Sequence, residues 1–257
     1  MNKIIFGDAI DLLKSLDSNS IDLIITDPPY GIGYHSNHYK DKNPHSPVLN
    51  DWDFDIGSFM VESSRVLKDG GALYLFTRYD VYPIWVKWVQ NPIKFSNLIV
   101  WEKDNWSAGD LKGNFGNQYE MIMFMVKGRH LIRGYRYSNI WKFSRVSSKK
   151  MRSPTEKPVD LIKRIIESSS DKGNIVLDPF CGSGSVGEAA RDLEREFILG
   201  DLDAKMIRVT SERLGMEVPE VNKNVTVPVC PIFNIEPPSI SMWGLHPEDV
   251  LYIKGEE

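Results

Sequence analysis

The stretch NIVLDPFCGSGSVGEAA, residues 174–190, decides the fold. It opens with a short apolar run, typical of a buried strand, that ends at Asp178. Glycines follow at Gly182, Gly184 and Gly187 in the spacing G-x-G-x-x-G, and a helical pattern begins among them. A glycine loop between a strand and a helix is typical of open α/β sheets that bind a ligand beyond the carboxyl ends of their strands.

Strand and helix patterns alternate along most of the chain, which predicts a mostly parallel α/β sheet with helices on both faces. A helix is expected over 58–71, ending at the pair Gly70-Gly71, and another over 79–89. The apolar runs 97–103 and 120–127 are expected to pair as an antiparallel hairpin. Seven strands are expected in all, within 3–6, 20–26, 72–76, 97–103, 120–127, 174–180 and 195–201.

Length and composition exclude several classes of protein. The 257 residues, 42% of them hydrophobic, suit one large domain or a domain with an insertion. No apolar stretch of about 18 residues occurs and we see no export signal, so a cytoplasmic protein without a membrane span is expected. The two cysteines, Cys181 and Cys230, form no CxxC pair, so neither a disulfide framework nor a zinc site is expected.

The glycine loop alone leaves its ligand open, because a dinucleotide site has the same spacing. Asp178 would repel a phosphate at the start of the loop, whereas it suits a ligand with positive charge, such as the ammonium and sulfonium groups of S-adenosylmethionine. Asp201 ends the next predicted strand and could accept hydrogen bonds from both ribose hydroxyls. A tight turn without a ligand is the third possibility.

A second informative stretch is LIITDPPYGIGY, residues 23–34. Prolines cannot donate to a sheet, so the strand must end before Pro28-Pro29. The Asp27 carboxylate, the Pro28 carbonyl and the Tyr30 ring are therefore expected at the carboxyl edge of the sheet, where ligands bind. Taken singly, Asp27 could be a turn residue and Tyr30 a core aromatic.

Three motifs in this order carry a family resemblance. DPPY at 27–30, TEKP at 155–158 and DPFCGSG at 178–184 resemble the β-type, circularly permuted DNA amino-methyltransferases that use S-adenosylmethionine. The resemblance covers roughly residues 1–214 and implies a Rossmann-like methyltransferase fold. In that fold the strands ending at Asp27 and Asp178 are neighbours. One departure is Ser153, where many relatives have His before the Pro-Thr pair.

The resemblance also implies roles for individual residues. The target amine would meet Asp27, Pro28, Pro29 and Tyr30, because a weakly nucleophilic exocyclic amine needs two acceptors to aim its lone pair at the methyl group. Tyr30 would stack on a base flipped out of the duplex. The cofactor would be held by eight residues: Asp8, Thr155, Lys157, Asp178, Phe180, Gly182, Gly184 and Asp201.

Charge is distributed unevenly along the chain, whose net charge is −4. Residues 121–155 carry nine bases and no acid, interleaved with aromatic side chains. The bases begin at Lys127, and we call residues 127–153 the basic segment. We predict that the basic segment and the polar loop 31–55 are insertions that contact double-stranded DNA; a solvated charged face is the alternative. The residues chosen for DNA contact are Arg129, Arg133, Arg136, Lys142 and Arg145.

These patterns favour a DNA adenine-N6 methyltransferase that uses S-adenosylmethionine and no metal. Cytosine-N4 methylation is the nearest alternative, and relatives with that activity more often have Ser than Asp at position 27. An RNA substrate, an inactive nucleic-acid-binding module and a dehydrogenase are weaker alternatives. A homodimer fits the resemblance, and any restriction endonuclease would be a separate chain. The acidic, proline-rich tail 215–257 has no assigned role.

Overall fold

The computed structural model describes residues 2–30, 54–106, 112–147 and 149–220. The chain divides into units at 1–227 and 228–257, and only the first contains described residues. Most of the predicted loop 31–55 and of the tail 215–257 therefore lies outside the described residues. None of the helices in the described ranges is long and apolar enough to cross a membrane.

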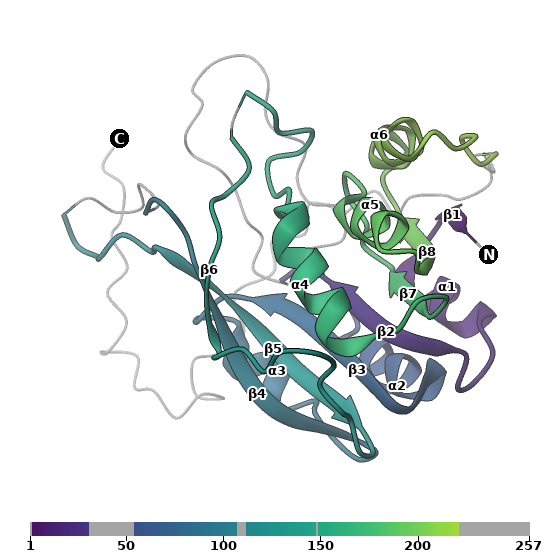
Figure 1. Cartoon of the computed structure of the whole chain (residues 1–257), viewed down its shortest axis with the longest axis horizontal. Helices are drawn as coiled ribbons and strands as arrows, with labels where there is room; N and C mark the ends of the chain where they lie inside the picture. The colour runs from purple at the N-terminus through teal and green to yellow at the C-terminus, as the bar shows by residue number, and fades with distance from the viewer. Residues whose placement is uncertain (1, 31–53, 107–111, 148, 221–257) are drawn as a thin grey trace, which may run out of the picture. The chain divides into compact units, whose positions relative to one another are not determined.

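An eight-stranded mixed sheet forms the centre of the first unit, in the order β1-β8-β7-β2-β3-β5-β4-β6 (Figure 1). The pairs are parallel except where β5 lies between β3 and β4. The antiparallel pairing of the two predicted apolar runs is thus confirmed. The strands are β1 (Lys3–Phe6), β2 (Ile21–Thr26), β3 (Leu67–Thr77), β4 (Ile93–Glu102), β5 (Tyr119–Lys127), β6 (Ile140–Lys142), β7 (Ile175–Asp178) and β8 (Glu196–Asp201).

Helices cover both faces of the sheet, as the alternating pattern predicts. In β2, Leu23 and Ile25 face one hydrophobic cluster and Ile24 faces the other, because successive side chains of a strand point to opposite faces. Helices α4 (Val159–Ser169), α5 (Ser185–Asp192) and α6 (Ala204–Leu214) pack on the first face. Helices α1 (Ala9–Ser15), α2 (Ile56–Val66) and α3 (Tyr82–Val86) pack on the second.

The sheet has a topological switch point between β2 and β7. These strands are parallel neighbours, with Leu23 opposite Val176 and Ile24 opposite Leu177. From β2 the chain continues to β3 on one side, and from β7 it continues to β8 on the other. Ligands bind beyond the carboxyl ends of strands at such a point, and here those ends carry Asp27 and Asp178.

Three predictions about the elements are wrong. The sheet has eight strands rather than seven, because the basic segment contributes β6, a three-residue edge strand parallel to β4. The helix expected to end at the glycine pair ends at Val66, and β3 begins at once and runs through both glycines. A Cβ on Gly71 would lie 2.9 Å from the Asp22 carbonyl oxygen, so this glycine serves a close strand approach. The helix expected over 79–89 is only the five-residue α3.

Candidate active site

A pocket of about 70 Å³ opens at the carboxyl ends of β2 and β7. Its walls come from segments that are far apart in the sequence: the ends of β2 and β3, the loop before α4, and the glycine loop before α5. Six of the predicted site residues line it, namely Asp27, Thr155, Lys157, Asp178, Phe180 and Gly182. Ser153, the departure from the family pattern, also lines it and is buried.

Asp178 is a buried carboxylate at the base of this pocket, with only 4% of its surface exposed. The Phe180 backbone N–H donates to its Oδ1 over 3.1 Å, and among the described residues no cationic side chain forms an ion pair with it. Burial raises its pKa to about 8, and the charges of Asp201 and Asp27 act in the same direction. The site is therefore suited to a positively charged ligand, which would favour the ionised carboxylate.

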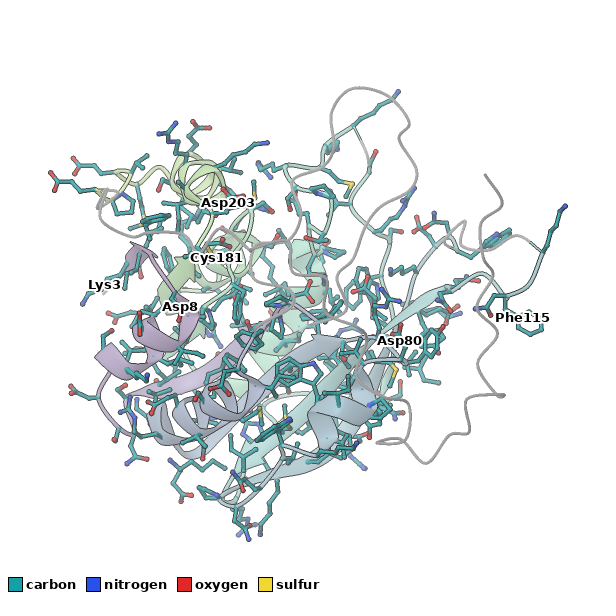
Figure 2. The ribbon with its side chains drawn as sticks, turned by 180° about the vertical axis from the view of Figure 1, so that it is seen from behind. Lys3, Asp8, Asp80, Phe115, Cys181 and Asp203 are labelled. Carbon is teal, nitrogen blue, oxygen red and sulfur yellow. The ribbon has the colours of Figure 1, made fainter. Side chains whose placement is uncertain are left out.

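The glycine loop bends tightly around the pocket, and two of its glycines have positive φ. Gly182 has φ +49°, and a Cβ added there would meet no atom within 4 Å, so the backbone faces open space. Gly184 has φ +80° and begins α5; a Cβ there would lie 2.9 Å from Thr210 Cγ2. Thr210 Oγ1 donates to the Gly182 carbonyl over 2.7 Å, which holds the loop in place. Cys181 on this loop is labelled in Figure 2.

Asp201, at the end of β8, fixes the glycine loop from the neighbouring strand. Its two carboxylate oxygens accept the backbone N–H groups of Gly182 and Asp203, each over 2.8 Å. Burial raises its pKa to about 6, although these hydrogen bonds oppose the shift. Asp201 and Gly184 do not line the 70 Å³ pocket; Gly184 belongs to the glycine loop, and Asp201 holds that loop by accepting the Gly182 N–H.

Asp8 has a structural task that sequence reasoning did not assign. Its carboxylate caps α1, accepting the N–H groups of Ile10 over 2.8 Å and Asp11 over 3.2 Å. It follows β1, whose last residue Phe6 lies opposite Asp201, so Asp8 lies at the same edge of the sheet as the cofactor residues. Figure 2 labels Asp8 and Asp203, which begin α1 and α6.

Asp27 makes two side-chain contacts at the end of β2. The Tyr30 hydroxyl donates to Asp27 Oδ1 over 2.7 Å, and the Lys157 ammonium contacts Oδ2. Burial first, and then the Asp27 charge, raise the Tyr30 pKa far above its ordinary value, so the hydroxyl stays a donor. Lys157 was predicted for the methionine end of the cofactor; the structure places its ammonium on the carboxylate predicted to bind the target amine.

Glu120, the second residue of β5, is a member of this cluster that sequence reasoning missed. Its Oε2 lies 3.4 Å from the Lys157 ammonium and its Oε1 lies 2.6 Å from the Lys103 ammonium. Burial alone would raise the Glu120 pKa, but the two lysines outweigh it and hold the pKa below its ordinary value. The only signal in the sequence is an acid at the start of an otherwise apolar strand, which does not reveal its partners.

A buried ion pair that sequence reasoning also missed anchors the TEKP segment. Glu156 and Arg213 each expose only 2% of their side chains and form an ion pair over 2.9 Å. Arg213, near the end of α6, also donates to the Ser183 carbonyl over 2.9 Å and contacts Glu188 of α5. The segment that carries Thr155 and Lys157 is therefore fixed to the glycine loop through a buried network.

The basic segment is partly used for internal contacts. Arg133 pairs with Asp171 over 3.3 Å and donates to the Leu131 carbonyl over 3.0 Å. The other four arginine and lysine residues predicted for DNA contact, Arg129, Arg136, Lys142 and Arg145, are exposed. Three aromatic residues of the segment surround Arg164 of α4, whose guanidinium carbon lies 4.3–5.6 Å from the ring centroids of Tyr137, Trp141 and Phe143.

Comparison with known proteins gives consistent matches. A family model described as DNA methylase matches residues 21–212. The DNA adenine methyltransferase YhdJ of Escherichia coli is 31% identical over 247 residues, covering 83% of this chain and 82% of the relative. The type II methyltransferase M.HpaI of Haemophilus parainfluenzae is 31% identical over 242 residues, covering 84% and 74%.

Solved structures share the fold at lower identity. The M1.HpyAVI–SAM complex superposes with a TM-score of 0.67 at 23% identity, covering 84% of this chain and all of that one. The cytosine-N4-specific PvuII DNA methyltransferase gives 0.63 at 13% identity, covering 88% and 89%. Because a cytosine-N4 enzyme has the same fold, the target base must be argued from other features.

Proposed function

Because this chain belongs to the DNA methylase family, we propose that the pocket between β2 and β7 is its methyl-transfer site. The protein is an S-adenosylmethionine-dependent DNA adenine methyltransferase that acts on the N6 amine. The relative YhdJ, a DNA adenine methyltransferase with 31% identity to this chain, favours adenine over the cytosine-N4 alternative.

One observation carries the assignment of the pocket. The Asp27 carboxylate at the end of β2 and the Asp178 carboxylate at the end of β7 line the same pocket, although they are far apart in the sequence. Asp27 is suited to a neutral amine, because its carboxylate can accept N–H bonds while Tyr30 and Lys157 fix its orientation. Asp178 is suited to a cation, because it is buried without a cationic partner among the described residues.

The residues at the end of β7 and in the glycine loop would hold the cofactor. S-adenosylmethionine, when bound, supplies a methyl group activated by a positively charged sulfur. Asp178, Phe180 and Gly182 line the part of the pocket suited to its charged methionine portion, and Thr155, from the loop before α4, lines the same pocket. Asp201, which accepts the Gly182 N–H, is the proposed acceptor for the ribose hydroxyls, and Asp8, at the same edge of the sheet, is proposed for the adenine end.

The residues of the β2 side would act on the target base. The Asp27 carboxylate and the Pro28 carbonyl accept the two N–H bonds of the amine, which aims the nitrogen lone pair into the pocket. The nitrogen would gain the methyl carbon as the bond of that carbon to the donor sulfur breaks, and it would lose one proton, for which Asp27 is an available acceptor. Pro29 stiffens the turn, and Tyr30 offers a face on which a flipped adenine stacks, a contact typically worth about 1–3 kcal/mol.

Several finer assignments belong to the same proposal. The motif order DPPY, TEKP, DPFCGSG supports a β-type, circularly permuted member of the family. The substrate is double-stranded DNA, contacted by the 127–153 segment and the 31–55 loop. The proposal also includes a homodimer, a cytoplasmic location and a separate restriction endonuclease, the last in keeping with the type II methyltransferase M.HpaI among the relatives.

The experiment is transfer of tritiated methyl groups to duplex DNA, followed by mass spectrometry of the nucleosides. We expect N6-methyladenine as the product. Asp27→Ala should lose most of the transfer while retaining S-adenosylmethionine binding, whereas the control Asp17→Ala changes an exposed acid before β2 and should behave as wild type. N4-methylcytosine as the product would overturn the base assignment, and near-normal turnover of Asp27→Ala would overturn the role of Asp27.

A further inference from the structure

Four charged side chains of alternating sign form a row at the carboxyl edge of the sheet. Asp27 follows β2, Lys157 precedes α4, Glu120 is the second residue of β5 and Lys103 follows β4. Lys157 contacts Asp27 Oδ2 and lies 3.4 Å from Glu120 Oε2, while Lys103 lies 2.6 Å from Glu120 Oε1. Lys157 is therefore shared by two carboxylates, of which only Asp27 lines the pocket.

The row is largely shielded from water, which strengthens its electrostatic interactions. The exposed fractions of the side chains are 12% for Lys157, 22% for Asp27, 20% for Glu120 and 21% for Lys103. Burial alone would lower the Lys157 pKa, but the charges of Asp27 and Glu120 outweigh it and hold that pKa above its ordinary value. Lys157 thus stays a cation that both acids attract.

Glu120 is held on a rigid part of the fold. It lies opposite Trp101 in the β4–β5 pairing, and the next residue, Met121, lies opposite Thr77 of β3. Lys157 also contacts the buried Phe76 ring, whose centroid is 5.2 Å from the ammonium. Because Glu120 is carried on a paired strand, its backbone is fixed, and its carboxylate restricts where the Lys157 ammonium lies.

The sharing of Lys157 between Asp27 and Glu120 also affects how strongly Asp27 can accept a hydrogen bond. A lysine paired with Asp27 alone would place its whole charge on that carboxylate and weaken it as an acceptor for a neutral amine. The negative charge of Glu120 offsets part of the Lys157 charge, and Lys103 in turn balances Glu120. The four side chains together are neutral, which limits the cost of burying them.

We infer that Glu120 is a positioning residue for methyl transfer, acting through Lys157. It holds the Lys157 ammonium on Asp27 Oδ2 and offsets part of its charge, so that the Asp27 carboxylate keeps both the orientation and the acceptor strength that the target amine requires. This inference rests on the proposed function of the pocket, and it adds a residue outside the three motifs.

The test is a double-mutant cycle on methyl transfer with Glu120→Gln, Lys157→Met and the double variant. Glu120→Gln keeps the shape and removes the charge, so kcat should fall roughly tenfold or more, with the affinity for S-adenosylmethionine unchanged. In the Lys157→Met background the same substitution should have almost no further effect, because the residue through which Glu120 acts is gone. The matched control is Glu62→Gln, whose side chain is 18% exposed and pairs with Arg65 on α2.

Two results would overturn the inference. One is a kcat for Glu120→Gln within about twofold of wild type, which would mean that Asp27 does not depend on the shared lysine. The other is an equal loss from Glu120→Gln in the wild-type and Lys157→Met backgrounds, which would mean that Glu120 acts without Lys157.

A further variant keeps the test informative if Lys157→Met does not fold. Glu120→Asp retains the charge on a shorter side chain and should recover part of the kcat lost in Glu120→Gln; no recovery would refute a role for the charge. Failure of the proposed function would be distinct, because wild-type protein would then transfer no methyl group to adenine in DNA.

Discussion

Asp178 offers the sharpest test of how the pocket distinguishes a cationic ligand. Its carboxyl group is buried and its pKa is raised to about 8, mainly because burial disfavours the charged form. In the unfolded chain an aspartate has a pKa of about 3.9. Between these values the folded protein without ligand holds a proton on Asp178 that the unfolded chain has released.

The sign of the effect on stability follows from this difference. The folded state binds the additional proton from about pH 4 to about pH 8, so the contribution of Asp178 to stability declines as the pH rises through that window. At about 1.4 kcal/mol for each pH unit, the full loss is on the order of 5–6 kcal/mol, an upper figure for so buried a group. Asp178→Asn removes the titrating group, so the unliganded variant should lose less stability than wild type between pH 6 and pH 8.

Ligand binding provides the complementary measurement. At pH 7 a group with a pKa of about 8 is roughly nine-tenths protonated. A positively charged ligand favours the carboxylate, so S-adenosylmethionine binding should expel close to one proton from Asp178. Titration calorimetry in buffers of different ionisation enthalpy counts that proton, and Asp178→Asn serves as the control for protons gained or lost by the ligand itself.

Two outcomes would refute the reasoning about Asp178. Equal proton release by wild type and Asp178→Asn at pH 7 would show that the carboxyl group does not change its charge on binding. Unchanged affinity of Asp178→Asn would show that the ligand's positive charge lies elsewhere. Proton release measured above pH 7 distinguishes the contribution of Asp178 from that of Asp201. The pKa of Asp201 is raised only to about 6, so Asp201 is mostly ionised at that pH.

Three further predictions concern the cofactor loop and the DNA surface. Asp201→Ala should weaken S-adenosylmethionine binding about ten- to a hundredfold through lost charged hydrogen bonds, measured by calorimetry on the folded variant; wild-type affinity would place the ribose elsewhere. Gly184→Ala combines a positive φ with a close approach to Thr210, so it should lower stability by about 1–3 kcal/mol, seen as a lower midpoint in urea unfolding. Changing Arg133, Arg136 and Arg145 of the basic segment to Gln should weaken the salt dependence of DNA binding, lowering the log–log slope by up to about three units. The affinity for S-adenosylmethionine should stay unchanged. An identical slope would mean that the segment is a solvated face.

The strand ends that form the pocket could be predicted because the sequence stops those strands by local chemistry. Pro28-Pro29 cannot donate to the sheet after Asp27, and Pro179 likewise follows Asp178 before the glycine loop. Local signals of this kind act within a few residues, so they are visible in the sequence. The family resemblance carried by the three motifs then implied that β2 and β7 are neighbours, which the register confirms.

The same kind of signal misled where a residue served a distant neighbour. Gly70 and Gly71 look like a helix end, yet α2 ends earlier because Gly71 must pass close to the Asp22 carbonyl of β2. Three aromatic residues among the basic side chains, Tyr137, Trp141 and Phe143, likewise have a partner that the sequence does not reveal, because they surround Arg164 of α4. In both cases the partner lies in another element, and composition does not specify which one.

The surroundings of Asp27 show the limit of motif reasoning most clearly. The DPPY and TEKP motifs identify Asp27 and Lys157 separately, but their contact joins residues 130 positions apart. Glu120 enters the same cluster only because β5 runs antiparallel beside β3, which brings its first residues to the carboxyl edge of the sheet. A motif therefore specifies which groups are available for chemistry, whereas the fold decides which charges they face. Substitutions confined to the motifs would leave the contribution of Glu120 undetected, because the charge that balances Lys157 comes from a strand outside all three motifs.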